Sequence, residues 1–164
     1  MSAARIVATV FGTGLLRPGP GTWGSLAALP LGWAVMQLGP LAFVVAAILL
    51  APLGYWATAR VMAETGRDDP SEVVVDEVLG QWVALMPIAW GAAVADVGVE
   101  RLWPGWIAAF VLFRLFDIWK PGPVGWADRR HDAVGVMLDD VVAGAMAGVC
   151  VVALAALAHL WLIP

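Results

Sequence analysis

Acidic residues occur at three places where a long apolar run of the sequence begins or ends. They are Asp76 with Glu77, then Asp117, then Asp139 with Asp140. Carboxylate oxygens are the ligands that Mg²⁺ prefers, and Mg²⁺ in proteins usually contacts one or two carboxylates together with phosphate oxygens. The pattern therefore indicates phosphate chemistry at a magnesium site, with all five acids as candidate catalytic residues. The candidate metal ligands are the two adjacent pairs, Asp76, Glu77, Asp139 and Asp140.

Helix capping is the competing interpretation of these acids, because carboxylates are favoured at helix N-termini. However, each pair has two acids where one would cap. Asp117 also stands near the expected end of a helix, where a carboxylate is unfavourable. Arg114 lies three residues before Asp117 on the same helix face, and Lys120 lies three residues after it. A purely structural network of ion pairs is therefore a second alternative to a metal site.

The segment from Phe11 to Ser25 is rich in glycine, which permits close backbone approach and anion-binding nests of N–H groups. We expect Thr22 or Ser25 to cap the first apolar helix, so that its N-terminus faces a phosphate. An irregular loop without a ligand is the alternative. The candidate phosphate-binding residues are Arg17, Thr22, Ser25, Arg114 and Lys120.

The composition is that of a membrane protein. Apolar residues make up 62% of the chain and charged residues 13%, against roughly 45–50% and 25% in soluble domains. A soluble domain of this size could not bury so much apolar surface. The ten Trp suit the membrane interface, where Trp is enriched. Nucleic-acid binding is not indicated, since the net charge is −4 and there is no basic stripe. Zinc is not indicated either, because His131, His159 and Cys150 are isolated.

Five apolar segments are candidate membrane spans, near residues 25–38, 41–60, 78–95, 102–119 and 141–164. Because the first is short, we predict an all-α, polytopic membrane helical bundle of about four to five apolar helices, forming one domain over residues 1–164. In the last segment Asp140, Gly144 and Gly148 recur every four residues, a spacing of small residues that lets helices approach closely. The face that carries Asp140 is therefore expected to pack inward.

The distribution of Lys and Arg predicts the orientation, because these residues are concentrated on the cytoplasmic side of membranes. With the N-terminus in the cytoplasm, five spans place every basic residue except Arg101 on or near that side. The three acidic segments then fall on the cytoplasmic side as well. We therefore expect one shared site at the cytoplasmic face.

Four motifs follow one another along the chain: Gly21-Thr22-Trp23-Gly24-Ser25, Asp76-Glu77-x-x-Gly80, Phe113-Arg114-x-Phe116-Asp117-x-x-Lys120-Pro121 and Asp139-Asp140-x-x-Ala143-Gly144. In this order they resemble the phosphatidylglycerophosphatase A family, over about residues 9–148. The resemblance implies a magnesium-dependent enzyme of the bacterial cytoplasmic (inner) membrane that hydrolyses phosphatidylglycerophosphate to phosphatidylglycerol and inorganic phosphate. It also implies that the five acids form the site, with Arg114 and Lys120 nearby.

Two other classes of function stay open from the sequence. A small ion or lipid transporter or channel could use the same carboxylates, since acids within membranes often mark ion pathways. Against this, the acids lie at helix ends and no inverted repeat is evident. A non-catalytic lipid-binding or assembly subunit would use the acids only as caps. The expected partners are a phospholipid phosphate substrate and membrane lipids, and the oligomeric state, a homo-oligomer included, is left open.

Overall fold

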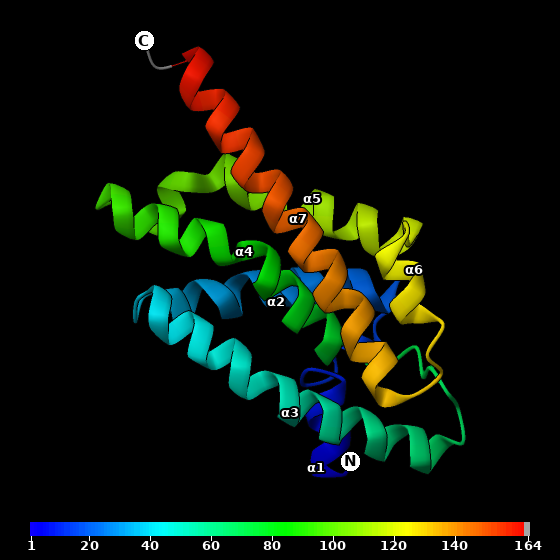
Figure 1. The fold of residues 1–164 in the computed structure, drawn as a ribbon. Helices are drawn as coiled ribbons and strands as arrows, with labels where there is room; N and C mark the ends of the chain where they lie inside the picture. The colour runs from blue at the N-terminus through cyan, green and yellow to red at the C-terminus, as the bar shows by residue number, and fades with distance from the viewer. Residues whose placement is uncertain (163–164) are drawn as a thin grey trace.

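The computed structural model describes residues 1–162, and within that range the chain contains helices and connecting loops but no strand (Figure 1). The α-helices are α1 (Ala3–Ala8), α2 (Pro20–Met36), α3 (Pro40–Thr65), α4 (Val75–Ala95), α5 (Trp103–Trp119), α6 (Pro123–Asp128) and α7 (Ala133–Leu162). Two short 3₁₀ helices, η1 (Thr13–Leu15) and η2 (Val99–Leu102), precede α2 and α5. The all-α prediction is confirmed.

Four helical stretches are long and apolar enough to cross a membrane, namely α3, α4, α7 and the continuous stretch Val99–Trp119 of η2 and α5. The protein is therefore a membrane protein, with the predicted number of apolar helices. The first predicted segment is α2, which has 17 residues. At about 1.5 Å per residue it is about 25 Å long, somewhat less than a hydrocarbon core of about 30 Å.

The predicted start of the last span is wrong. α7 begins at Ala133 rather than near residue 141, because Asp132 Oδ1 accepts a hydrogen bond from the backbone N–H of Gly135 at 2.7 Å and starts the helix there. Asp139 and Asp140 therefore lie inside α7, and the interpretation that they cap it is also wrong. Positions 163 and 164 of the predicted span lie outside the described residues.

The predicted cap of α2 is wrong as well. α2 begins at Pro20, after Gly19 in the left-handed conformation, and no side chain caps it. Thr22 and Ser25 consequently lie inside the helix. The start of α4 agrees better with the prediction, since the helix begins at Val75 and places Asp76 and Glu77 in its first turn.

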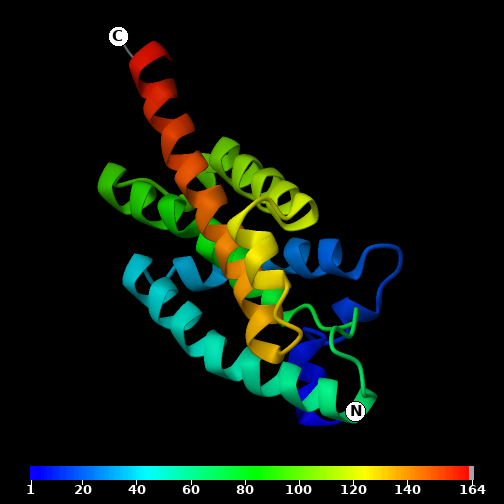
Figure 2. The same cartoon turned by 45° about the vertical axis from the view of Figure 1, so that its right-hand side comes forward.

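α4 lies at the centre of the bundle and contacts α2, α3, α5 and α7 (Figures 1 and 2). More than half of its apolar stretch, 56%, is buried, against 11–28% for the other three candidate spans. Protein therefore covers more of this helix than of the other spans, most completely over its first turns. Residues on α4 thus have neighbours on several sides, whereas the other spans keep a broad apolar face for the bilayer.

The contact between α4 and α7 is made by backbone. A β-carbon at Gly144 would overlap the carbonyl oxygen of Gly80, and a β-carbon at Gly80 would lie 2.6 Å from the carbonyl oxygen of Asp140. One turn further along α7, Gly148 faces Val83 and Pro87 of α4. The prediction that this face of α7 packs inward is confirmed.

The loop over residues 66–74, between α3 and α4, is anchored by Glu72. Its buried carboxylate forms ion pairs with Arg67 and, at 3.5 Å, with Arg5 of α1. Burial acts to raise the pKa of Glu72. A hydrogen bond from its own backbone and the two arginines outweigh that effect, so the net pKa lies below its ordinary value. Glu72 therefore stays ionised and holds the loop against α1.

We predict that Gly144→Ala destabilises the protein and that Gly148→Ala does not. A methyl group at position 144 overlaps the Gly80 backbone, and such overpacking costs about 1–3 kcal/mol. The same methyl group at position 148 lies 3.5 Å from its nearest neighbour, an ordinary contact. Thermal unfolding midpoints of both variants, purified in one detergent, measure the difference. Equal midpoints would contradict the close approach of α4 and α7.

Candidate active site

A cavity of about 530 Å³ lies at the end of the bundle where α4 and α7 begin and α5 ends. Its walls come from the start of α2, the loop 66–74, α4, α5, α7 and the loop between α6 and α7. Seven of the predicted site residues line it: Asp76, Glu77, Arg114, Asp117, Lys120, Asp139 and Asp140. The structure thus brings together all five predicted acids and two of the five predicted phosphate-binding residues.

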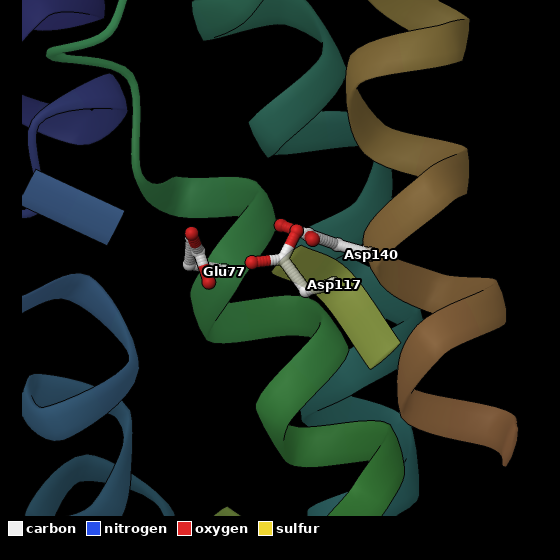
Figure 3. Close-up of side chains that lie close together, drawn as sticks. All are labelled: Glu77, Asp117 and Asp140. Carbon is white, nitrogen blue, oxygen red and sulfur yellow. The ribbon is translucent and has the colours of Figure 1, made fainter. Parts of the chain in front are cut away.

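Three of the acids are close enough to share one cation. One carboxylate oxygen each of Glu77, Asp117 and Asp140 lies within 4.8 Å of the others. The three side chains come from α4, α5 and α7, and Figure 3 shows Asp117 and Asp140 turned toward each other beside Glu77. We call these residues the carboxylate trio. The trio includes Asp117, which was not among the predicted metal ligands, in place of Asp76 and Asp139.

Asp140 is the member of the trio whose carboxylate has the fewest hydrogen-bond and ion-pair partners. Its side chain is 4% exposed, and among residues 1–162 no hydrogen bond or ion pair to its carboxylate is formed. The carboxylate lines the cavity, so it is open to water or to a cation that enters there. A divalent cation at the trio would give this carboxylate a positive partner.

Arg114 balances part of the trio's charge from α5. Its Nη1 forms ion pairs with Glu77 of α4 and, at 2.8 Å, with Asp117 one turn along its own helix. The predicted pairing of Arg114 with Asp117 is therefore confirmed. Ser25 Oγ lies 2.8 Å from Glu77 Oε2 and accepts a hydrogen bond from Arg114 Nη1 at 3.3 Å. Ser25 thus supports Glu77 from α2 and lies outside the cavity lining.

Each of the other two acids accepts a hydrogen bond from the backbone N–H of the residue that follows it. Asp76 Oδ1 accepts from Glu77 N at 2.9 Å, and Asp139 Oδ1 accepts from Asp140 N at 3.0 Å. Asp139 Oδ2 also pairs with Lys120 Nζ at 3.0 Å. These two acids therefore border the trio in the same cavity, each held by an interaction of its own.

Lys120 links three elements at the edge of the cavity. It ends α5 in the left-handed conformation and pairs with Asp128 of α6 and Asp139 of α7. Partial burial acts to lower the pKa of Lys120, but hydrogen bonds to the two carboxylates and their charge outweigh it. The net pKa therefore lies well above its usual range. Lys120 is thus a permanent positive charge beside the acids.

The glycine-rich segment contributes backbone rather than side chains. Gly19, Pro20 and Gly21 line the cavity, and a β-carbon at Gly21 would overlap the carboxylate of Glu77. Arg17 is exposed and donates to Ser71 Oγ at 3.4 Å. Thr22 is half-buried on α2. Both lie outside the lining, and their role in phosphate binding stays a prediction.

Sequence reasoning missed the outer rim of the cavity. Asp68, Asp69 and Ser71 of the loop 66–74 form one part of it, and Asp128 at the end of α6 forms the other with Arg130 and His131 of the following loop. His131 is exposed and lines the cavity. The sequence offered one signal for these residues, because each of the two polar segments comes shortly before an acidic motif.

Comparison with known proteins agrees with this geometry. The profile of the phosphatidylglycerophosphatase A family matches residues 6–155. The chain is 37% identical over 142 residues to phosphatidylglycerophosphatase A of Escherichia coli, covering 85% of this chain and 76% of the relative. It is 35% identical to that of Haemophilus influenzae, covering 94% and 90%. A Bacteroides thetaiotaomicron protein, provisionally named a phosphatidylinositol-3-phosphatase, is 40% identical over 85% of each chain. No solved structure matches.

We predict that Arg114→Gln lowers the stability of the metal-free protein and that Mg²⁺ restores part of the loss. The variant leaves the buried Glu77 and the half-buried Asp117 without their counter-ion, and breaking a buried pair costs about 3–5 kcal/mol. The control is Arg130→Gln, which breaks only the exposed pair with Asp132. Unfolding midpoints in EDTA and in Mg²⁺ measure the effect. Equal behaviour of the two variants would show that Arg114 does not hold the acids together.

Proposed function

The chain belongs to the phosphatidylglycerophosphatase A family and is a phosphatase, and on this premise we propose that it hydrolyses phosphatidylglycerophosphate to phosphatidylglycerol and inorganic phosphate with Mg²⁺ at the carboxylate trio. The observation that carries the proposal is the convergence of three carboxylates from three helices within 4.8 Å of one another. They stand in a cavity that also presents Arg114 and Lys120. A cation and a phosphate can bind there side by side.

The residues present fit Mg²⁺ by the chemistry of their donors. The trio offers only carboxylate oxygens, the hard ligands that Mg²⁺ prefers, and no His or Cys joins the group among the described residues. The unpartnered carboxylate of Asp140 supports the same assignment. When bound, Mg²⁺ supplies charge stabilisation at phosphate oxygens and a lower pKa for an attacking water.

The cations of the cavity bind and orient the phosphate. The Arg114 guanidinium can form paired N–H bonds to phosphate oxygens, and it is already placed beside the trio by Glu77 and Asp117. Lys120 adds a fixed positive charge that stabilises the transferring phosphoryl group. Despite partial burial, the carboxylates of Asp128 and Asp139 raise the pKa of Lys120, so Lys120 brings a positive charge to the phosphate.

A carboxylate of the cavity acts either as the general base for the attacking water or as the nucleophile that attacks phosphorus. In one route an acid accepts a proton from the attacking water, the water oxygen bonds to phosphorus, the ester P–O bond breaks, and the departing glycerol oxygen takes up a proton. In the other route the carboxylate itself attacks phosphorus, the ester P–O bond breaks, and the departing glycerol oxygen takes up a proton; water then hydrolyses the acyl phosphate to the carboxylate and inorganic phosphate. Trapping of a phosphoenzyme separates the two routes.

The position of the cavity suits a lipid substrate. Ile118 and Trp119 are largely exposed on α5 next to Lys120, at 70% and 71%, so acyl chains can stay in the bilayer while the headgroup enters the cavity. Lys and Arg are concentrated at the end of the helical bundle that holds the cavity. This supports a location of the cavity at the cytoplasmic face of the bacterial inner membrane. The partners are then the phospholipid phosphate and surrounding membrane lipids.

A second substrate is favoured by one relative. The name of the Bacteroides thetaiotaomicron protein points to the 3-phosphate of phosphatidylinositol, which is also a phosphate monoester on a lipid headgroup. Transport through the same carboxylates is the weaker alternative, because the two bacterial relatives above are named as phosphatases.

We predict that the protein, purified in detergent, releases inorganic phosphate from phosphatidylglycerophosphate when Mg²⁺ is present and not in excess EDTA. The same assay with phosphatidylinositol 3-phosphate compares the two headgroups. Faster release from phosphatidylglycerophosphate supports the proposal, whereas faster release from the inositol lipid reassigns the substrate. A folded protein that releases no phosphate with any divalent metal would remove the phosphatase assignment.

We predict that Asp140→Asn lowers kcat by about 100-fold or more, beyond the 10- to 100-fold typical of losing a group that only supports a metal ligand. The substitution removes the negative charge that the cation needs and keeps the size of the side chain. Asp132→Asn is the matched control, since Asp132 is exposed at the start of α7 and outside the cavity lining. Full activity in Asp140→Asn would remove Asp140 from the site.

A further inference from the structure

Gln81 is a buried polar residue that the proposed mechanism does not use. Its side chain is fully buried on α4, and within residues 1–162 neither its amide nitrogen nor its amide oxygen has a hydrogen-bond partner. An unsatisfied buried donor or acceptor costs about 1–3 kcal/mol, and polar residues inside membrane helices are expensive. A packing role alone would be better filled by an apolar side chain, so the amide needs another explanation.

The position of Gln81 is directly beneath the carboxylate trio. It follows Glu77 by four residues on α4, so the two side chains are neighbours on one helix face. Side chains in a helix lean toward its N-terminus, which tilts the amide toward the turn of Glu77. On the α2 side, Ser25 contacts Glu77 and Gly32 faces Leu85. Gln81 lies between these two levels, one turn deeper than the cavity.

Two other groups at this level have hydrogen-bonding capacity to spare. Arg114 Nε is buried, and no acceptor for it exists among residues 1–162. Glu77 Oε2 accepts from Ser25 and Arg114, whereas Oε1 lies against Gly21 and accepts no hydrogen bond from the described residues. The Glu77 carboxylate oxygen can accept a further hydrogen bond, and the buried Arg114 Nε–H needs an acceptor. The amide of Gln81 offers one of each.

We propose that Gln81 is a positioning residue for the metal-loaded site, a role that rests on the function proposed above. In the metal-loaded site its amide N–H donates toward the carboxylate of Glu77 and its amide oxygen accepts from Arg114 Nε through buried water, because this structure has no direct hydrogen bond between these groups. Glu77 is thereby aimed at the cation, and Arg114 is held at the depth of the phosphate. Supporting groups of this kind orient metal ligands and typically change metal affinity or activity by 10- to 100-fold.

The test uses Gln81→Met, which keeps the length of the side chain and removes the amide. We expect the Kd for Mn²⁺, measured by the EPR signal of free Mn²⁺, to rise by about 10- to 100-fold, and kcat to fall by a similar factor. KM for the lipid should change little. The unfolding midpoint in EDTA should stay equal or rise, because an apolar group replaces an unsatisfied amide. A merely structural role would move the midpoint and not the affinity.

Leu85→Met is the matched control, one turn deeper on the same helix and also fully buried; it should leave Mn²⁺ affinity and kcat unchanged. If Gln81→Met does not fold, Gln81→Leu repeats the test, and failure of both to fold would overturn the proposal by showing that the amide is needed for folding. Wild-type affinity and kcat in either variant would overturn it while leaving the phosphatase intact. A wild-type protein that neither binds Mn²⁺ nor releases phosphate would overturn both.

Discussion

Repulsion among five carboxylates in one cavity is the constraint on which the rest of the structure depends. Asp76, Glu77, Asp117, Asp139 and Asp140 converge from three helices, and like charges in a poorly hydrated site repel strongly. Arg114 and Lys120 offset part of this repulsion through pairs with Glu77, Asp117 and Asp139. Asp76 and Asp140 have no cationic partner among the described residues, and the cluster of Glu77, Asp117 and Asp140 could hold a metal ion that neutralises part of the remaining charge. Binding of a cation at this cluster would therefore lower the repulsion as well as serve the proposed chemistry.

Bringing the acids together depends on how closely two helices can approach. Gly80 and Gly144 allow the backbones of α4 and α7 to touch, and this contact carries Asp140 to the level of Glu77. A third glycine, Gly21, lets the start of α2 lie against Glu77. Small residues promote helix association in membranes, where lipid offers no hydrophobic drive between helices. In this protein the same small residues also determine how close together the acids of the cavity lie.

The central position of α4 explains why one helix carries both the acids and the polar residue beneath them. Protein surrounds α4 on several sides, so polar groups on it can face other helices instead of lipid. Glu77 and Gln81 lie at such protected positions, at successive turns of one face of α4. The outer spans present apolar surface to the bilayer, and a lipid headgroup can reach the acids from the open end of the bundle. Membrane burial and phosphate chemistry are thereby compatible in a short chain.

Much of this could be predicted from residue order alone. The uncharged runs determine the helices, because a membrane helix must hide its backbone polar groups by itself. The spacing of Arg114 and Asp117 determines their pairing, because helix geometry is local. Tertiary structure decided the rest. The start of α7 depends on one capping hydrogen bond from Asp132. The choice of Asp117 for the trio, the contact of Ser25 with Glu77 and the isolation of Gln81 depend on distances between helices. Those distances follow from backbone contacts between residues far apart in sequence, such as Gly80 and Gly144. The spacing of small residues predicted that this face of α7 packs inward, but a local pattern does not encode which helix it meets or at what level.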